Sequence, residues 1–284
     1  MYFKHIVETG VILLALSAAS MALFFSIMFF KVVSIVYFLV VFFLTYSVYG
    51  MDRLTSLEED RLSHPERTLF LQKNRQAFVA SVVLSFSVSL TLSATSGWVV
   101  ALIPIAPLAV MFYSGKLPKS VTFTKSPLKE QFVTKDICVA SGWAFLLLVT
   151  AVYLNRPIQV GALLFLIPLL LKLFVMAVVY DFKDIKSDRS SGFLTLPVKL
   201  GEKPTKLVLH ALNATATILI LLLIIFGLIP FLALVFIPAF IYQLVVIQKV
   251  SQEAPGWVYF VLCDLEQFFW LVFLGLGVGL IGYH

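Results

Sequence analysis

Residues 157–188 read PIQVGALLFLIPLLLKLFVMAVVY followed directly by DFKDIKSD. The part before Asp181 is almost wholly apolar, and a helix of about 20 such residues crosses the ~30 Å hydrocarbon layer of a bilayer. Asp181, Asp184 and Asp188 follow at helical spacing, which places three carboxylates on one side of the helix end. The stretch therefore predicts a transmembrane helix that carries an acidic cluster to the membrane surface.

Comparable apolar runs recur along the whole chain of 284 residues, which is 61% hydrophobic and 13% charged. Ordinary soluble domains are about one quarter charged, so a soluble fold is excluded. The runs are continuous and do not alternate, which excludes an outer-membrane β-barrel. We expect an all-α polytopic membrane protein of about nine transmembrane helices in one bundle. The predicted spans are 9–30, 32–51, 77–95, 97–114, 136–154, 157–180, 206–228, 229–248 and 256–282.

The loops alternate between long and short. The long loops, 52–76, 115–135 and 181–206, hold five, five and six Lys and Arg residues, whereas the opposite face has Lys31 and Arg156. The positive-inside rule therefore places the long loops in the cytoplasm, as helical caps on the bundle. We expect a multi-pass protein of a prokaryotic plasma membrane, surrounded by membrane lipid. The net charge of +6 reflects these loops and does not indicate a nucleic-acid partner.

Acidic loops after the second and the sixth span suggest one domain, residues 1–284, with two pseudo-equivalent halves of about 1–135 and 136–284. In the first of these loops Asp52, Ser56 and Asp60 are four residues apart and share a face of a continued helix, with Glu59 at its edge. Hard oxygen ligands suit Mg²⁺, which usually takes one or two carboxylates together with phosphate oxygens. Two facing acidic helix ends could hold magnesium around a diphosphate, while solvated loop charges are the alternative.

The second cluster continues into Thr195-Leu-Pro-Val-Lys-Leu-Gly201. In this respect the chain resembles the UbiA superfamily of intramembrane prenyltransferases, whose second aspartate motif is followed by a threonine-leucine-proline-valine segment. The long loops after helices two, four and six are also similar to the family's arrangement.

The first cluster resembles the family's NxxxDxxxD motif when Asp60 takes the last place, because Pro65 and Arg67 then match the family's proline and arginine. Asp52 then stands in place of the asparagine and Ser56 in place of the middle aspartate. A serine hydroxyl is a weaker magnesium ligand than a carboxylate. Either Asp52 and Glu59 complete the ligand set or the first site is weakened.

The resemblance implies Mg²⁺-dependent transfer of a prenyl group from an isoprenyl diphosphate, for example geranylgeranyl diphosphate, to an aromatic or lipid acceptor within the membrane. A terpene cyclase of the same fold is an alternative, as is a cation-coupled transporter of a different class. The implied catalytic residues are Asp52, Asp60, Asp184 and Asp188. The implied metal ligands are Asp52, Ser56, Glu59, Asp60, Asp181, Asp184 and Asp188.

Cationic side chains of the loops are expected to stabilise charge on the departing diphosphate. The predicted diphosphate contacts are Arg67, Tyr113, Lys116, Lys119 and Arg189, with Lys125, Lys129 and Lys135 as further candidates. For each lysine, the positive-inside topology signal is the alternative.

Three ionisable residues lie inside apolar spans, where charge is costly: Lys172, Asp264 and Glu266. Lys172 and Asp264 either form a pair or are buried separately between helices.

Overall fold

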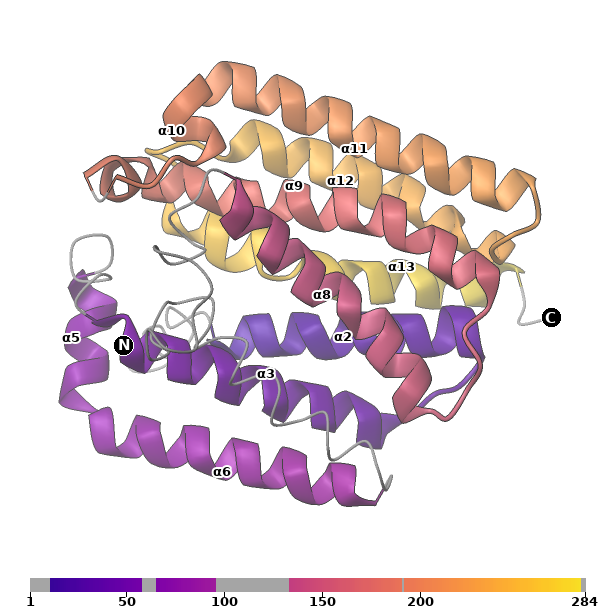
Figure 1. Ribbon diagram of the computed structural model, residues 1–284, viewed down its shortest axis with the longest axis horizontal. Coiled ribbons are helices and arrows are strands. Elements are labelled where there is room, and N and C mark those ends of the chain that lie inside the picture. The colour runs from indigo at the N-terminus through magenta and orange to yellow at the C-terminus, as the bar shows by residue number, and fades with distance from the viewer. Residues whose placement is uncertain (1–10, 58–64, 96–132, 191, 282–284) are drawn as a thin grey trace, which may run out of the picture.

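The computed structural model describes residues 11–57, 65–95, 133–190 and 192–281, and these ranges contain helices and no strands (Figure 1). Seven of the described helical segments are long and apolar enough to cross a membrane. The predicted all-α membrane bundle is therefore confirmed. The seven are α2 (Val11–Phe30), α3 (Ile35–Thr55), α6 (Arg75–Ala94), α8 (Thr134–Tyr153), α9 (Val160–Ser190), α11 (Glu202–Ile225) and the run Phe231–Lys249, in which the 3-10 helix η3 (Phe231–Val235) continues as α12 (Phe236–Lys249).

The predicted span at 97–114 lies outside the described residues, so the count of nine is not tested. The last predicted span, 256–282, is not one regular α-helix. It begins as a π-helix, η4 (Val258–Cys263), and continues after a short turn as α13 (Glu266–Ile281). The π geometry is visible in the hydrogen bond from the Asp264 amide to the Tyr259 carbonyl, five residues earlier, at 3.2 Å.

The helices pack in one bundle. In Figure 1 the helices follow one another from α11 and α12 through α9, α13 and α2 to α3 and α6. The contacts agree, since α6 packs on α3, α3 on α2, α2 on α13, and α9 on both α8 and α11. The central helix α2 contains Ser17-Ala-Ala-Ser20, all of it buried. Small residues let helix backbones approach closely in membrane proteins, which suits α2 to the centre. The division into two equivalent halves stays a prediction.

Two glycines mark the closest approaches between elements. A Cβ on Gly161, at the start of α9, would lie 1.7 Å from the carbonyl oxygen of Leu228. A Cβ on Gly50 of α3 would lie 2.5 Å from Cγ2 of Val82 on α6. The missing side chain therefore lets α9 reach the turn before η3, and lets α3 pack on α6.

One end of the bundle gathers the loop helices and the acidic segments. Figure 1 shows α5 (Pro65–Lys73), the end of α3, the end of α9 and α10 (Leu196–Leu200) at this same end. The predicted helical caps are thus present in the first and third long loops, while the middle loop lies outside the described residues. The threonine-leucine-proline-valine segment forms α10, because Thr195 precedes it, Pro197 suits its first turn, and Gly201 ends it with φ of 85°.

Candidate functional site

The last turns of α9 hold two aspartates of the second cluster against the start of α8. The Lys135 ammonium donates a hydrogen bond to Asp181 Oδ1 at 2.5 Å and lies 4.0 Å from Asp188 Oδ2. Asp181 is fully buried and Asp188 is 6% exposed. A buried carboxylate is costly unless a cation or hydrogen-bond donors face it. Lys135 supplies that charge, so α8 and α9 together form this part of the site.

Sequence reasoning missed a further carboxylate beside this pair. Asp136, in the first turn of α8, is 1% exposed, and its carboxyl group neighbours that of Asp181. The signal was present, because an acidic residue stands directly after Lys135 where a predicted membrane span begins. Three carboxylates therefore meet around the ammonium of Lys135.

A second face of α9 carries cationic groups toward the first half of the chain. The Lys183 ammonium lies 5.4 Å from the ring centre of Tyr180 and 5.9 Å from that of Tyr259 in η4. Arg53 at the end of α3 and Arg67 of α5 lie within electrostatic range of Lys183. Three cations from three separate elements therefore converge at this end of the bundle, next to Asp184. Only Arg67 among these three was predicted.

The first cluster is only partly within the described residues. Helix α3 ends at Thr55, because Ser56 still donates its amide to the Asp52 carbonyl oxygen at 2.9 Å but itself leaves helical geometry, with φ of −105° and ψ of 15°. The helix was expected to continue through Ser56 to Asp60, and this expectation is wrong at Ser56. Glu59 and Asp60 lie outside the described residues, so the predicted ligand set of the first cluster stays a prediction.

The predicted diphosphate contacts fall into three groups. The Arg67 side chain is buried, 6% exposed, and lies within range of Lys183 and Asp264. Arg189, in the last turn of α9, is exposed, and no contact among the described residues places it with the carboxylates. Tyr113, Lys116, Lys119, Lys125 and Lys129 lie outside the described residues.

A layer of aromatic and polar groups lies on the interior side of the acidic end, since Tyr49 and Tyr180 precede the acidic residues of α3 and α9 and Trp143 follows those of α8. The Trp143 indole donates to the Tyr49 hydroxyl at 3.0 Å, linking α8 to α3. The Tyr180 hydroxyl donates to Asp264 Oδ1 at 2.5 Å, linking α9 to the residue that follows η4. Tyr49 and Asp264 lie within electrostatic range of each other. The Tyr49–Trp143 pair and the Tyr180–Asp264 pair thus lie near each other within the bundle.

The residues of the second cluster fit a magnesium ion held jointly with a phosphate group. Asp181 Oδ2 and Asp188 Oδ2 are buried and accept no hydrogen bond from the described part of the chain. Within the described ranges, no three His, Cys, Asp or Glu side chains converge as a complete metal cage, and Lys135 stands between these two aspartates. Since Mg²⁺ commonly takes one or two carboxylates plus phosphate oxygens, these two carboxylate oxygens suffice on the protein side.

Of the two alternatives for Lys172 and Asp264, the structure shows separate burial and no pair. The fully buried Lys172 ammonium donates to Asn213 Oδ1 at 2.9 Å and to Gln243 Oε1 at 3.4 Å. Its acidic neighbour is Glu266. The π-helix before Asp264 adds a residue to one turn and so rotates the later part of the helix by about 100°. Asp264 and Glu266 both follow this turn, and Glu266 lies toward Lys172 while Asp264 lies toward Tyr180.

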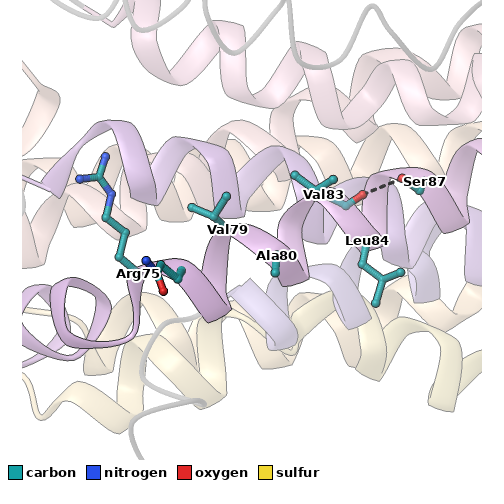
Figure 2. Close-up of a pocket in the computed structure, with 7 residues that line it drawn as sticks. Arg75, Val79, Ala80, Val83, Leu84 and Ser87 are labelled. Carbon is teal, nitrogen blue, oxygen red and sulfur yellow. Dashed lines mark hydrogen bonds between the residues drawn. The ribbon is translucent and has the colours of Figure 1, made fainter.

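A shallow groove runs along α6 on the outside of the bundle. Figure 2 shows its lining side chains, which are apolar apart from Arg75 and Gln76 at one end and Ser87 at the other. The Ser87 hydroxyl donates to the Val83 carbonyl of its own helix at 3.0 Å. The groove contains none of the carboxylates of the second cluster, so we do not assign the chemistry to it.

Comparisons with known proteins agree with this architecture. The model of the UbiA prenyltransferase family matches residues 9–273. A UbiA homolog from Archaeoglobus fulgidus bound to DMAPP and Mg²⁺ is similar with a TM-score of 0.67 and 12% identity, covering 99% of this chain and 100% of that one. The apo structure of a UbiA homolog from Aeropyrum pernix K1 is similar with a TM-score of 0.63 and 16% identity, covering 94% of this chain and 96% of that one.

A structure of digeranylgeranylglyceryl phosphate synthase is also similar, with a TM-score of 0.57, 17% identity and coverage of 95% of this chain and 97% of that one. No curated protein sequence matches the chain. At these identities the solved structures establish a shared fold, and the family model covers nearly the whole chain. The resemblance predicted from the aspartate motifs is confirmed, and this integral membrane protein is an enzyme of the UbiA prenyltransferase family.

Proposed function

We propose that the protein transfers a prenyl group from an isoprenyl diphosphate to an aromatic or lipid acceptor within the membrane, in a reaction that depends on Mg²⁺. The observation that carries this proposal is the gathering of charged groups at one end of an apolar bundle, where Asp181 and Asp188 lie against Lys135 and where Lys183, Arg53 and Arg67 lie near Asp184. The Archaeoglobus fulgidus homolog, which binds DMAPP and Mg²⁺ in this fold, supports it. The basic loops favour the cytoplasmic face of a prokaryotic plasma membrane for this end.

The residues of α9 and their neighbours have two separate roles, metal binding and stabilisation of charge on the diphosphate. Asp181, Asp184 and Asp188 would hold the magnesium, which supplies Lewis-acid stabilisation of the leaving diphosphate. Arg53, Arg67 and Lys183 stabilise the negative charge that develops on the diphosphate oxygens as the allylic carbon–oxygen bond breaks. Preorganised cations are effective in this role because they need no reorientation during the reaction.

The deeper aromatic layer suits the other product of ionisation, the allylic cation. The layer contains Tyr49 and Trp143, whose ring centres are 6.3 Å apart, and Tyr180. Aromatic faces attract cations, and the surrounding helices exclude water, which would otherwise capture the cation. The layer therefore separates the polar end of the site, where the diphosphate would bind, from the apolar interior, which would hold the prenyl chain.

The test is to incubate the purified protein in detergent with Mg²⁺ and labelled geranylgeranyl diphosphate, and to measure pyrophosphate with and without acceptors. Release that requires an acceptor, together with a prenylated product, is the expected result. Release with a cyclic hydrocarbon and no acceptor would assign a terpene cyclase instead. No release together with no magnesium-dependent binding of the diphosphate would overturn both enzyme assignments.

Substitutions of the aspartates sharpen this test. Asp184→Ala or Asp188→Ala should abolish turnover, because each removes a charged group from the second cluster. Asp52→Asn should reduce turnover less, since asparagine is the residue that the family motif has at that place. Glu253→Ala is the matched control, because Glu253 is an exposed acid in the loop before η4. Full activity of Asp188→Ala would contradict the assignment of the second cluster.

A further inference from the structure

Asp264 is a buried carboxylate that neither the metal site nor the helix packing accounts for. It follows the π-helix η4, is 4% exposed, and accepts a hydrogen bond from the Tyr180 hydroxyl at 2.5 Å. A π turn inside a membrane helix rearranges its hydrogen bonds and is frequently found at functional sites. Acidic side chains at such depth usually face a cavity, a substrate path or a partner. The local geometry thus holds a carboxylate inside the bundle at one fixed orientation.

The surroundings of Asp264 connect it to the proposed diphosphate site. Its electrostatic neighbours are Lys183 of α9, Arg53 of α3 and Arg67 of α5, the same three cations that converge beside Asp184. Tyr49, which is held by Trp143, also lies within electrostatic range. A group bound against Asp264 would therefore lie near the cations to which we assign the diphosphate.

Glu266, two residues further on, provides a contrast on the same helix. Its carboxyl group accepts a hydrogen bond from the Trp270 indole at 3.2 Å and faces Lys172 and Gln243. Lys172 in turn is hydrogen bonded to Asn213 of α11. These contacts tie α9, α11, α12 and α13 together, so Glu266 has a packing role. Asp264 instead faces a tyrosine hydroxyl and the cations of the site.

We propose that the Asp264–Tyr180 pair forms the subsite for the nucleophilic group of the acceptor, and that this group is a hydroxyl of a lipid-soluble alcohol or phenol. The hydroxyl donates its hydrogen bond to the Asp264 carboxylate, which Tyr180 holds in place. This proposal rests on the proposed prenyl transfer and adds the class of acceptor and its binding residues.

The step balances without any further reactant. The hydroxyl oxygen forms a bond to C1 of the prenyl chain, and the bond from C1 to the diphosphate oxygen breaks with its electron pair on the diphosphate. The hydroxyl proton passes to the Asp264 carboxylate. A positioned proton acceptor of this kind typically contributes about 100- to 10,000-fold to a rate.

Two variants test the subsite against a matched control. Asp264→Asn keeps the volume and the hydrogen bond from Tyr180 but cannot take a proton. Tyr180→Phe removes only the hydroxyl that orients the carboxylate. Tyr242→Phe is the control, because it removes a tyrosine hydroxyl of α12 that donates to the Leu262 carbonyl of η4 at 2.6 Å.

The assay measures three quantities in each variant: magnesium-dependent binding of labelled geranylgeranyl diphosphate, pyrophosphate release without acceptor, and transfer to two acceptors, 4-hydroxybenzoate and a glycerol-phosphate ether lipid. Asp264→Asn should bind the diphosphate as the wild type does, yet lose transfer by about 100-fold or more with whichever acceptor the wild type uses. Tyr180→Phe should raise the acceptor KM and lower kcat, whereas Tyr242→Phe should change neither quantity.

Wild-type rates of transfer in Asp264→Asn would overturn the subsite, as would a loss of diphosphate binding, which would place Asp264 in the diphosphate site. Equal losses in Tyr180→Phe and Tyr242→Phe would assign Tyr180 to packing alone and count against the proposal. If the wild type itself neither binds the diphosphate nor transfers the prenyl group, the proposed function fails, and that outcome is distinct from a failure of the subsite.

Discussion

Replacing Lys135 with methionine removes the cation that two buried aspartates share. The Lys135 ammonium is 2.5 Å from Asp181 Oδ1 and 4.0 Å from Asp188 Oδ2, and the two carboxylates are 0% and 8% exposed. Breaking a buried ion pair from one side typically destabilises a protein by about 3–5 kcal/mol. Because the lysine side chain is itself 24% exposed, we expect the lower end, about 3 kcal/mol.

The same variant should respond more strongly to magnesium. In the wild type a metal ion must compete with the ammonium for the oxygens of Asp181 and Asp188, whereas in Lys135→Met it replaces a missing charge. A ligand present at about 100 times its Kd stabilises a protein by about 2.7 kcal/mol, so Mg²⁺ with inorganic pyrophosphate should restore most of the lost stability.

The assay is a thermal melt in detergent, without ligand and with magnesium and pyrophosphate at one fixed concentration, roughly 100 times their Kd for Lys135→Met. Lys186→Met is the control, because it removes the same charge from an exposed position of α9. We expect Lys135→Met to melt well below Lys186→Met without metal, and to approach it with metal. Identical melting of the two variants, or an unchanged shift on adding magnesium, would refute the shared-cation account.

Two further predictions concern packing. Gly161→Ala should destabilise the bundle by about 1–3 kcal/mol in a thermal melt, because the new Cβ would lie 1.7 Å from the Leu228 carbonyl oxygen. Gly142→Ala is the control: no atom from another described element lies within 4 Å of its Cβ, so it should be neutral or stabilising in the same melt. Lys172→Met should lower the melting temperature by leaving Glu266 buried without its cation, and adding Glu266→Gln should restore most of the loss; a double variant as unstable as the single one would contradict this pairing.

The sequence was sufficient for the architecture because membrane spans follow from continuous apolar length. The run at 157–180 is observed as part of α9, and the loop after it forms the predicted helical cap. The second aspartate cluster was also predicted, since its spacing places Asp181 and Asp188 on one side of a helix. That helix continues to Ser190 without a break, so the helical spacing applies throughout the cluster.

The partners of those aspartates could not be predicted in the same way. Lys135 and Asp136 come from another helix, and which of its residues face α9 depends on how α8 is rotated in the bundle. The π-helix before Asp264 could not be predicted either, because one extra residue in a turn leaves no distinct pattern of apolar residues in the sequence. The face on which Asp264 and Glu266 lie, and hence which of them neighbours Lys172, therefore could not be derived from the spacing.

The measurement that tests the central claim most directly is equilibrium binding of labelled geranylgeranyl diphosphate to the purified protein. Binding is compared in Mg²⁺ and in EDTA, for the wild type and for the Asp184→Ala/Asp188→Ala double variant. We predict that the wild type binds only with Mg²⁺ and that the double variant binds at least about 10-fold more weakly. Equal binding in EDTA, or equal binding by the double variant, would contradict the account of a magnesium diphosphate held by the second aspartate cluster.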